Sequence, residues 1–195
     1  LGRILRYDVD SRLSGFDPAA ISTRAPAANL TGTISAVGGG TGAAAELVDA
    51  LLHDPTAVPV VSLLAEADGR AIGHVLFTGA TVRGDGVIVP ASILAPLAVV
   101  PEAQRRGVGQ TLIRAGIEAL RARDVGLVFV LGHIEYYPRA GFRPALPLGL
   151  RAPYDIDPAV ADAWMVLETR AGLLGTVRGI VRCADTFMRP ELWRE

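Results

Sequence analysis

The chain has 195 residues, of which half are apolar and a fifth are charged. This length suits one domain, or one domain with appendages, and the apolar content is enough for a substantial core. The formal net charge is −1, without a long basic run. A general nucleic-acid binder normally carries a basic face, so the composition disfavours nucleic acid as a partner.

Other bulk features narrow the class further. All 19 basic residues are arginine, and together with the many Ala and Gly residues this favours a bacterial source. Cys183 is a single cysteine, which fits a reducing cytoplasm and a small buried hydrophobe rather than a nucleophile. The longest charge-free run, residues 86–101, is shorter than the ~20 residues of a membrane helix, and prolines interrupt it. We therefore expect a cytoplasmic protein without a membrane span, and no signal peptide is visible.

Residues 1–43 are heavily punctuated by Gly and Pro and predict no regular element. The glycine run at 38–42 has the composition of a phosphate loop, but no lysine follows it, so a flexible connector is favoured. Further along, Leu47 and Leu51 lie four residues apart with Leu52 beside them. This spacing predicts a short amphipathic helix over residues 43–52.

The next segment predicts three strands joined by short turns. Apolar runs cover residues 58–64, 71–82 and 88–100, and the turn sequences Asp68-Gly69 and Gly84-Asp85-Gly86 separate them. Consecutive strands with such short connections form an antiparallel meander.

The pattern then changes to a helical period over residues 107–123, followed by an unbroken apolar run at 125–131. A run of this kind is typical of a strand buried on both faces. Strand, helix and strand over this distance predict a βαβ crossover with two parallel strands. A short helix at 135–140 and strands from 142 and over 163–168 complete a mixed α/β sheet.

The most informative segment is L-A-P-L-A-V-V-P-E-A-Q-R-R-G-V-G-Q-T-L, residues 94–112. It joins a strand to a helix through a Gln/Arg-rich turn that contains Gly107 and Gly109. Glycines let a phosphate approach the backbone, and the unpaired amides of a helix start attract anions. Arg105 and Arg106 add positive charge nearby. A dinucleotide fold is disfavoured, because Leu112 stands where its third glycine would be.

Two motifs in this order resemble the GNAT superfamily of N-acetyltransferases. Q-x-x-G-x-G after the strand residues Leu97-Ala98-Val99 is similar to the acetyl-CoA signature of that family. L-G-H-I-E-Y-Y-P-R-A-G-F, residues 131–142, resembles its second hallmark, in which an aromatic pair precedes a short helix ending in Gly-Phe. The resemblance covers residues 47–142 and extends more loosely through 143–170.

The resemblance implies a GNAT-type mixed sheet, in which an antiparallel meander leads into a central βαβ unit with splayed parallel strands. Residues 44–170 would form the acetyltransferase domain and residues 1–43 an N-terminal segment. The tail, residues 171–195, would be an extra strand, a homodimer contact or a lid.

The resemblance also implies where the cosubstrate, acetyl-CoA, would lie. The pantetheine arm would bond to backbone in the gap between the splayed strands, at Leu97, Ala98 and Val99. The diphosphate would meet the turn and the helix start. The residues implied there are Gln104, Arg105, Arg106, Gly107, Val108, Gly109, Gln110 and Thr111.

Acetyl transfer needs a base for the amine and a proton for the departing thiolate. Family members often place a tyrosine four residues before the Gly of Gly-Phe, which here is Tyr137, and a phenol is protonated at neutral pH. The base stays open between His74 and His133, since histidines titrate near neutrality, with Glu135 as a further candidate. The scattered histidines and single cysteine have no metal-ligand spacing, so no metal is predicted.

The implied activity is direct transfer of acetyl from acetyl-CoA to a primary amine, more readily a small molecule than a protein. Two alternatives keep the same fold: a non-catalytic acyl-CoA-binding or sensing module, and an enzyme that uses a longer acyl-CoA. A nucleotide-binding protein is a weaker alternative, because helix N-termini do not discriminate among phosphates.

Overall fold

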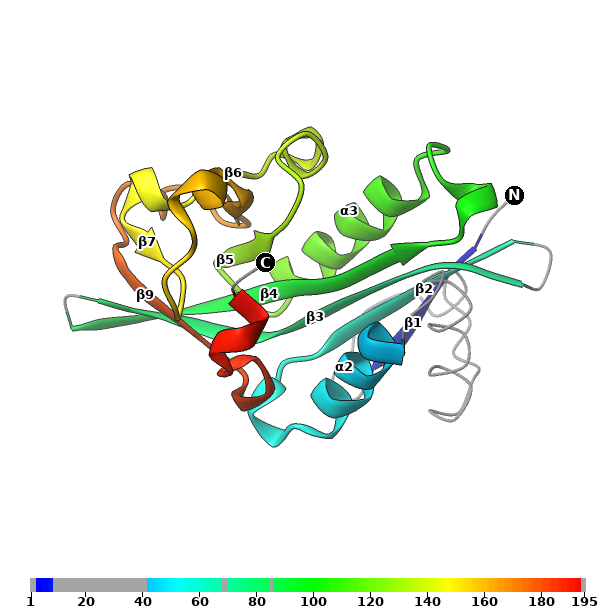
Figure 1. The fold of residues 1–195 in the computed structure, drawn as a ribbon, viewed down its shortest axis with the longest axis horizontal. Helices are drawn as coiled ribbons and strands as arrows, with labels where there is room; N and C mark the ends of the chain where they lie inside the picture. Colours follow the sequence, from blue (N-terminus) through cyan, green and yellow to red (C-terminus); the bar gives the residue numbers. More distant parts are fainter. Residues whose placement is uncertain (1–2, 9–41, 68–69, 85, 194–195) are drawn as a thin grey trace.

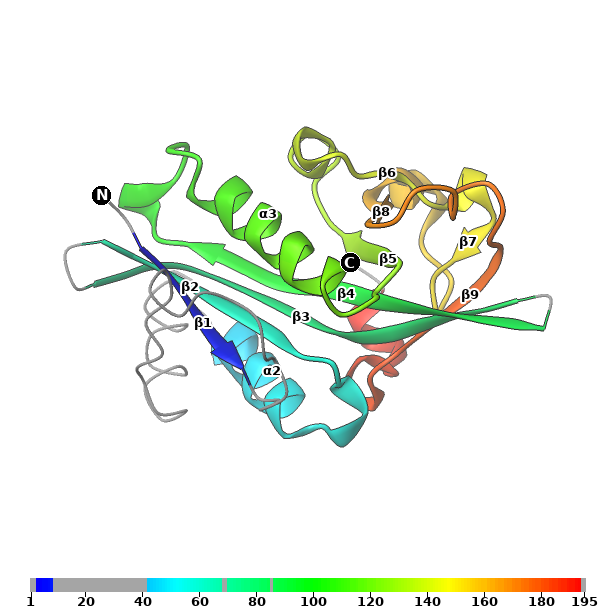
Figure 2. The ribbon, with the colours of Figure 1, turned by 180° about the vertical axis from the view of Figure 1, so that it is seen from behind.

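The computed structural model describes residues 3–8, 42–67, 70–84 and 86–193. Within these ranges nine strands form one mixed sheet, in the order β1-β2-β3-β4-β5-β8-β6, with β9 added beside β3 and β7 beside β9. Helix α3 covers one face of the sheet and α2 the other (Figures 1 and 2). The predicted α/β fold with a mixed sheet is confirmed.

The strands are β1 (Arg3–Asp8), β2 (Val61–Ala67), β3 (Arg70–Gly84), β4 (Val87–Val99), β5 (Leu127–Leu131), β6 (Arg143–Pro144), β7 (Leu150–Arg151), β8 (Trp164–Glu168) and β9 (Gly179–Cys183). The α-helices are α2 (Gly42–His53) and α3 (Val108–Arg121). Short 3-10 helices are η2 (Pro55–Ala57), η3 (Pro101–Ala103), η4 (Tyr137–Ala140), η5 (Leu146–Leu148), η6 (Pro158–Ala163), η7 (Asp185–Phe187) and η8 (Pro190–Trp193).

Strands β1 to β4 pair antiparallel, as the meander prediction requires. Strand β2 begins at Val61 instead of residue 58, because Asp54 caps a 3-10 turn over Pro55–Ala57 and its side chain accepts from the Thr56 amide. Strand β1 was not predicted. The predicted turn at Asp68-Gly69 and most of residues 1–43, including the glycine run, lie outside the described residues.

Strands β4 and β5 pair parallel and α3 connects them, which confirms the βαβ prediction. Helix α3 packs its apolar side on a core formed by β2, β3, β4 and β5. The approach is close: a Cβ on Gly116 would lie 2.0 Å from the Phe77 ring. The helix is therefore held rigidly against the sheet, and its first turn has a fixed place relative to β4.

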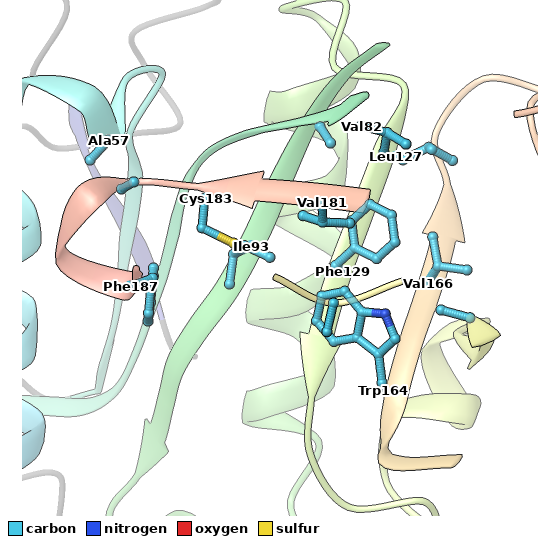
Figure 3. Close-up of a cluster of buried hydrophobic side chains, with 14 of the residues drawn as sticks. Ala57, Val82, Ile93, Leu127, Phe129, Trp164, Val166, Val181, Cys183 and Phe187 are labelled. Atoms are coloured by element: carbon cyan, nitrogen blue, oxygen red, sulfur yellow. The ribbon is translucent and has the colours of Figure 1, made fainter. Parts of the chain in front are cut away.

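The second core lies on the α2 face of the sheet and includes the C-terminal segment. Trp164 stacks on Phe129 with ring centroids 5.1 Å apart, and Val166 and Val181 lie around the pair (Figure 3). Of the alternatives for the tail, the structure shows a strand: β9 pairs antiparallel with the second half of β3. Cys183 on β9 is buried, and burial raises the pKa of its thiol to about 12.

Candidate active site

The parallel strands β4 and β5 separate before either of them ends. Their pairing runs only from Ala91 beside Leu127 to Ile93 beside Phe129, whereas β4 continues to Val99 and β5 to Leu131. A bulge accompanies the divergence, because Ala95 and Pro96 both lie opposite a single residue of β3. The splayed strands implied by the resemblance are present.

The divergence leaves the end of β4 accessible. Residues 91–94 are buried, whereas every residue from Ala95 to Val99 is partly exposed. Strand β3 pairs with Leu97, Ala98 and Val99 on one side, and β5 does not reach them on the other. Apart from the Val99 carbonyl, which accepts from the Gln104 side chain, backbone groups on that side are free to bond an extended ligand as an added strand would.

The turn between β4 and α3 has a backbone suited to an anion. Arg105 and Gly107 both have left-handed conformations, with φ of 58° and 83°, and the helix begins at Val108 without a side-chain cap. The amides of its first turn therefore lack intrahelical acceptors. Arg105 and Arg106 are exposed beside them, so the local charge is positive.

Three predicted cofactor residues also make bonds inside the protein. Gln104 donates its side-chain amide to the Val99 carbonyl at 3.0 Å, which fastens the turn to the end of β4. Gln110 donates its side-chain amide to the Tyr136 carbonyl at 3.2 Å, and the Thr111 hydroxyl donates to the Gly107 carbonyl at 3.0 Å. These side chains hold residues 104–111 in shape; this segment is named the phosphate turn after the ligand predicted for it.

Tyr137 lies at the start of η4, with its ring in the core beneath α3. Its ring meets Phe142 and Tyr136 edge-on, at centroid distances of 5.8 and 5.3 Å. It also packs on Gly132, where a Cβ would lie 2.4 Å from the ring. Burial, with a smaller contribution from Tyr136, raises the pKa of Tyr137 to about 12, so the phenol is a proton donor at neutral pH.

Tyr136 has a contact that the sequence analysis missed. A Cβ on Gly109 would lie 2.1 Å from the Tyr136 hydroxyl, so this phenol rests on the first turn of α3. The only sequence signal is the glycine itself, which the phosphate motif already explained.

His133 follows β5 and is exposed. It lines an open cavity of about 410 Å³ together with Ile134, Glu135, Tyr136 and Arg139. The structure thus brings two candidate bases, His133 and Glu135, and the aromatic pair together on the connection between β5 and β6.

His74 lies apart from that cavity. Its neighbour Val75 faces the core beneath α3, so His74 faces the α2 side of the sheet. It is fully buried, with Nε2 2.8 Å from the Ser62 hydroxyl and with Nδ1 unpartnered among the described residues. Burial lowers the pKa of His74 to about 4, which makes the imidazole a weak base.

Two absences concern residues 3–8, 42–67, 70–84 and 86–193. Among those residues there is no group of three His, Cys, Asp or Glu side chains placed to hold a metal ion. In the same part of the chain, the helices are too short or too polar to cross a bilayer.

Comparison with known proteins agrees with this geometry. Residues 39–142 match the model of the acetyltransferase (GNAT) family. Over 142 residues the chain is 50% identical to the uncharacterized N-acetyltransferase YjhQ of Escherichia coli K12, covering 72% of this chain and 78% of that protein.

Solved structures show the same fold. The GNAT family N-acetyltransferase YhbS of Escherichia coli, in complex with CoA, superposes with a TM-score of 0.74 at 25% identity, over 96% of this chain and 93% of that one. A GNAT acetyltransferase of Brucella melitensis, in complex with acetyl-CoA, gives 0.61 at 23% identity, over 95% and 98%. The splayed strands, the phosphate turn and these similarities lead to one conclusion: the chain is an N-acetyltransferase that belongs to the GNAT family.

Proposed function

We propose that the protein transfers the acetyl group of acetyl-CoA directly to the primary amine of a small molecule. The observation that carries the proposal is the open edge of β4 next to the uncapped start of α3. An extended chain ending in a diphosphate fits both features at once. The CoA complex of the similar YhbS protein supports the same cosubstrate.

In this proposal the pantetheine arm bonds to the backbone of Leu97, Ala98 and Val99, which β5 leaves accessible. The diphosphate binds the amides between Arg105 and Gln110, where the helix dipole and two arginines favour negative charge. The thioester then lies deep between the strands, close to the loop that carries Tyr137.

The reaction breaks the C–S bond of the thioester and forms a C–N bond. The amine attacks the carbonyl carbon after losing a proton, for which we propose His133, because it is the exposed imidazole at the cavity. A backbone amide such as that of Val99 stabilises the oxyanion. Tyr137, a phenol with a raised pKa, gives its proton to the departing thiolate.

The size of the cavity beside His133 supports a small acceptor. About 410 Å³ falls within the roughly 300–1,000 Å³ of small-molecule sites.

The test is a turnover assay with acetyl-CoA and a panel of small amines and lysine peptides, following both free thiol and acetylated product. The chain contains no lysine, so acetylation of its own lysine side chains cannot add to the signal. We expect equal amounts of thiol and N-acetylated small amine. Tight acetyl-CoA binding without transfer to any amine would instead favour the sensing module.

Acyl preference is tested by competition. Acetyl-, succinyl- and long-chain acyl-CoA are offered together with the best amine, and the products are counted by mass. If the acetylated product dominates, the proposal is supported. If a product with a longer acyl group dominates, the cosubstrate is the corresponding acyl-CoA instead of acetyl-CoA.

A further inference from the structure

The Tyr136 phenol lies where three elements of the active site meet. A Cβ on Gly109 would lie 2.1 Å from its hydroxyl oxygen and 3.6 Å from Cδ2 of Leu97. Gly109 belongs to the first turn of α3 and Leu97 to the open end of β4. The hydroxyl thus spans the gap from the β5 side and reaches the phosphate turn.

The surrounding contacts fix this position. The Tyr136 amide donates to the His133 carbonyl at 3.0 Å, and its carbonyl accepts from the Gln110 side chain. Its ring packs against Tyr137 at 5.3 Å. Backbone and ring are held from both sides, so the hydroxyl is aimed in advance at the start of α3.

The hydroxyl has donor capacity left over. Among the described residues, Gln110 is the side chain that hydrogen-bonds this phenol, and because that bond lowers the phenol's pKa, Gln110 donates and the hydroxyl proton stays available. Burial raises the pKa of Tyr136 above that of an ordinary phenol, although Gln110 and Arg139 partly oppose the effect. At neutral pH it therefore keeps its proton, beside backbone amides that also lack acceptors.

We infer that the Tyr136 hydroxyl donates a hydrogen bond to a diphosphate oxygen of acetyl-CoA. It thereby completes, from the β5 side, the anion site that the first turn of α3 provides from the other. The inference rests on the proposed function, since it assigns a ligand contact within that cosubstrate site. It makes Tyr136 a binding residue and leaves proton transfer to Tyr137.

The first test is Tyr136→Phe, which removes the oxygen and keeps the ring. Hydrogen bonds to charged groups contribute roughly 1.5–3 kcal/mol, so we expect a loss of about tenfold or more in acetyl-CoA affinity. Turnover at saturating acetyl-CoA should stay within about twofold, since the bond is made in ground state and transition state alike.

The second test uses a donor without phosphates. S-acetylpantetheine has the thioester and the arm but lacks the diphosphate. Wild type and Tyr136→Phe should therefore use it with the same kcat/KM. A penalty equal for both donors would mean that the phenol acts on the arm or on the fold, and would overturn the inference.

The placement of the hydroxyl is tested by suppression. Gly109→Ala puts a methyl group against the Tyr136 oxygen and should lower the melting temperature. In the Tyr136→Phe background the nearest neighbours are ring carbon Cζ at 3.4 Å and Leu97 at 3.6 Å, which are ordinary contacts. There the same alanine should be tolerated. An equal loss in both backgrounds would contradict the position on which the inference depends.

The matched control is Tyr154→Phe, because Tyr154 donates its hydroxyl to the Met188 carbonyl at 2.9 Å, away from the phosphate turn. It should leave acetyl-CoA affinity unchanged. If wild type binds acetyl-CoA and Tyr136→Phe binds it equally well, this inference alone is wrong. If wild type binds none, the proposed function fails as well.

Discussion

Two regions of the molecule use hydrogen bonds in opposite ways. The first is the open segment, residues 94–99 of β4, whose backbone is unpaired toward β5. The second is the C-terminal clasp, formed by Asp54, Thr56, Asp185 and Thr186. In the clasp, the Asp54 carboxylate accepts bonds from both threonines, each through its amide and its hydroxyl, at 2.6–2.8 Å.

The clasp joins residues far apart in the chain. Thr186 lies 132 positions after Asp54, and the Asp185 amide also donates to the Thr56 hydroxyl at 2.8 Å. Burial raises the pKa of the Asp54 carboxyl, but the four hydrogen bonds outweigh it and lower the pKa to about 2. Near the open segment, burial is the largest cause of the pKa shifts of His74 and Tyr137.

This difference in hydrogen bonding indicates that the clasp serves stability and the open segment serves function. Polar groups of the clasp are satisfied by one another and hold the tail against the body. In the open segment, backbone groups on the β5 side other than the Val99 carbonyl are left for a ligand. Substitutions in the clasp should therefore change stability, and substitutions around the open segment should change binding or turnover.

The largest effect is expected for Tyr137→Phe. Loss of the proton donor to the thiolate should lower turnover by about 10²-fold or more, with acetyl-CoA affinity changed less than twofold. Steady-state kinetics and calorimetric titration measure the two quantities, with Tyr154→Phe as control. Unchanged turnover would remove Tyr137 from the mechanism.

A substitution at His74, which pairs with Ala98 of the open segment, tests whether this buried histidine supports the fold or serves as the base. Its folded pKa of about 4 lies below the ordinary 6.5, so the unfolded chain binds the proton more tightly. The contribution of the neutral His74 to the free energy of unfolding is fully present above pH 6.5. It is lost as the pH drops toward 4, by up to about 3 kcal/mol.

In His74→Gln the loss of stability between pH 6.5 and pH 4 should largely disappear. Denaturant unfolding at several pH values measures this. His53→Gln, at a side chain that is 76% exposed, should leave the profile as in wild type. Turnover of His74→Gln should keep its pH dependence. If it loses the acidic limb instead, in which turnover falls as the base becomes protonated, His74 is the base and His133 is not.

Asp54→Ala tests the clasp. Losing bonds to a carboxylate should lower the free energy of unfolding by about 1–3 kcal/mol, while the KM for acetyl-CoA changes less than twofold. In wild type, this carboxylate contribution is present above about pH 4 and lost as the pH falls toward 2. Asp49→Ala, which breaks only an exposed pair with His53, should cost at most about 0.5 kcal/mol. A large rise in the KM for acetyl-CoA in Asp54→Ala would contradict the assignment of the clasp to stability alone.

The smallest effect is expected for Gln104→Ala. It removes the bond to the Val99 carbonyl and loosens the turn. One neutral hydrogen bond contributes about 0.5–1.5 kcal/mol, so acetyl-CoA affinity should fall a few-fold while melting temperature hardly changes. Glu102→Ala, at an exposed neighbour, serves as the comparison.

Local patterns predicted the βαβ unit well. Gly107 and the helical period placed α3 at 107–123, and it spans Val108–Arg121. The family resemblance depended on two glycine-containing motifs, Q-x-x-G-x-G and residues 131–142, which follow each other in the order that the family shows. Such features depend on neighbours in sequence, which periodicity and turn chemistry report directly.

Contacts between distant residues were not predictable in the same way. Strand β9 pairs with β3 about a hundred positions earlier, and the clasp spans a longer distance still. The sequence motif predicted Gly109 for phosphate approach, and the structure shows that Gly109 also leaves room for the Tyr136 hydroxyl, which comes from another element. A glycine shows that space is needed but does not show which side chain fills it.

The most direct test of the central claim is a thermal-shift titration with acetyl-CoA, beside CoA, ATP and NAD. A ligand that binds only the folded state adds roughly 2.7 kcal/mol at a hundred times its dissociation constant. We predict stabilisation by acetyl-CoA and CoA alone. A clear response to ATP or NAD, with none to acetyl-CoA, would contradict the assignment of the open segment and the start of α3 to acetyl-CoA.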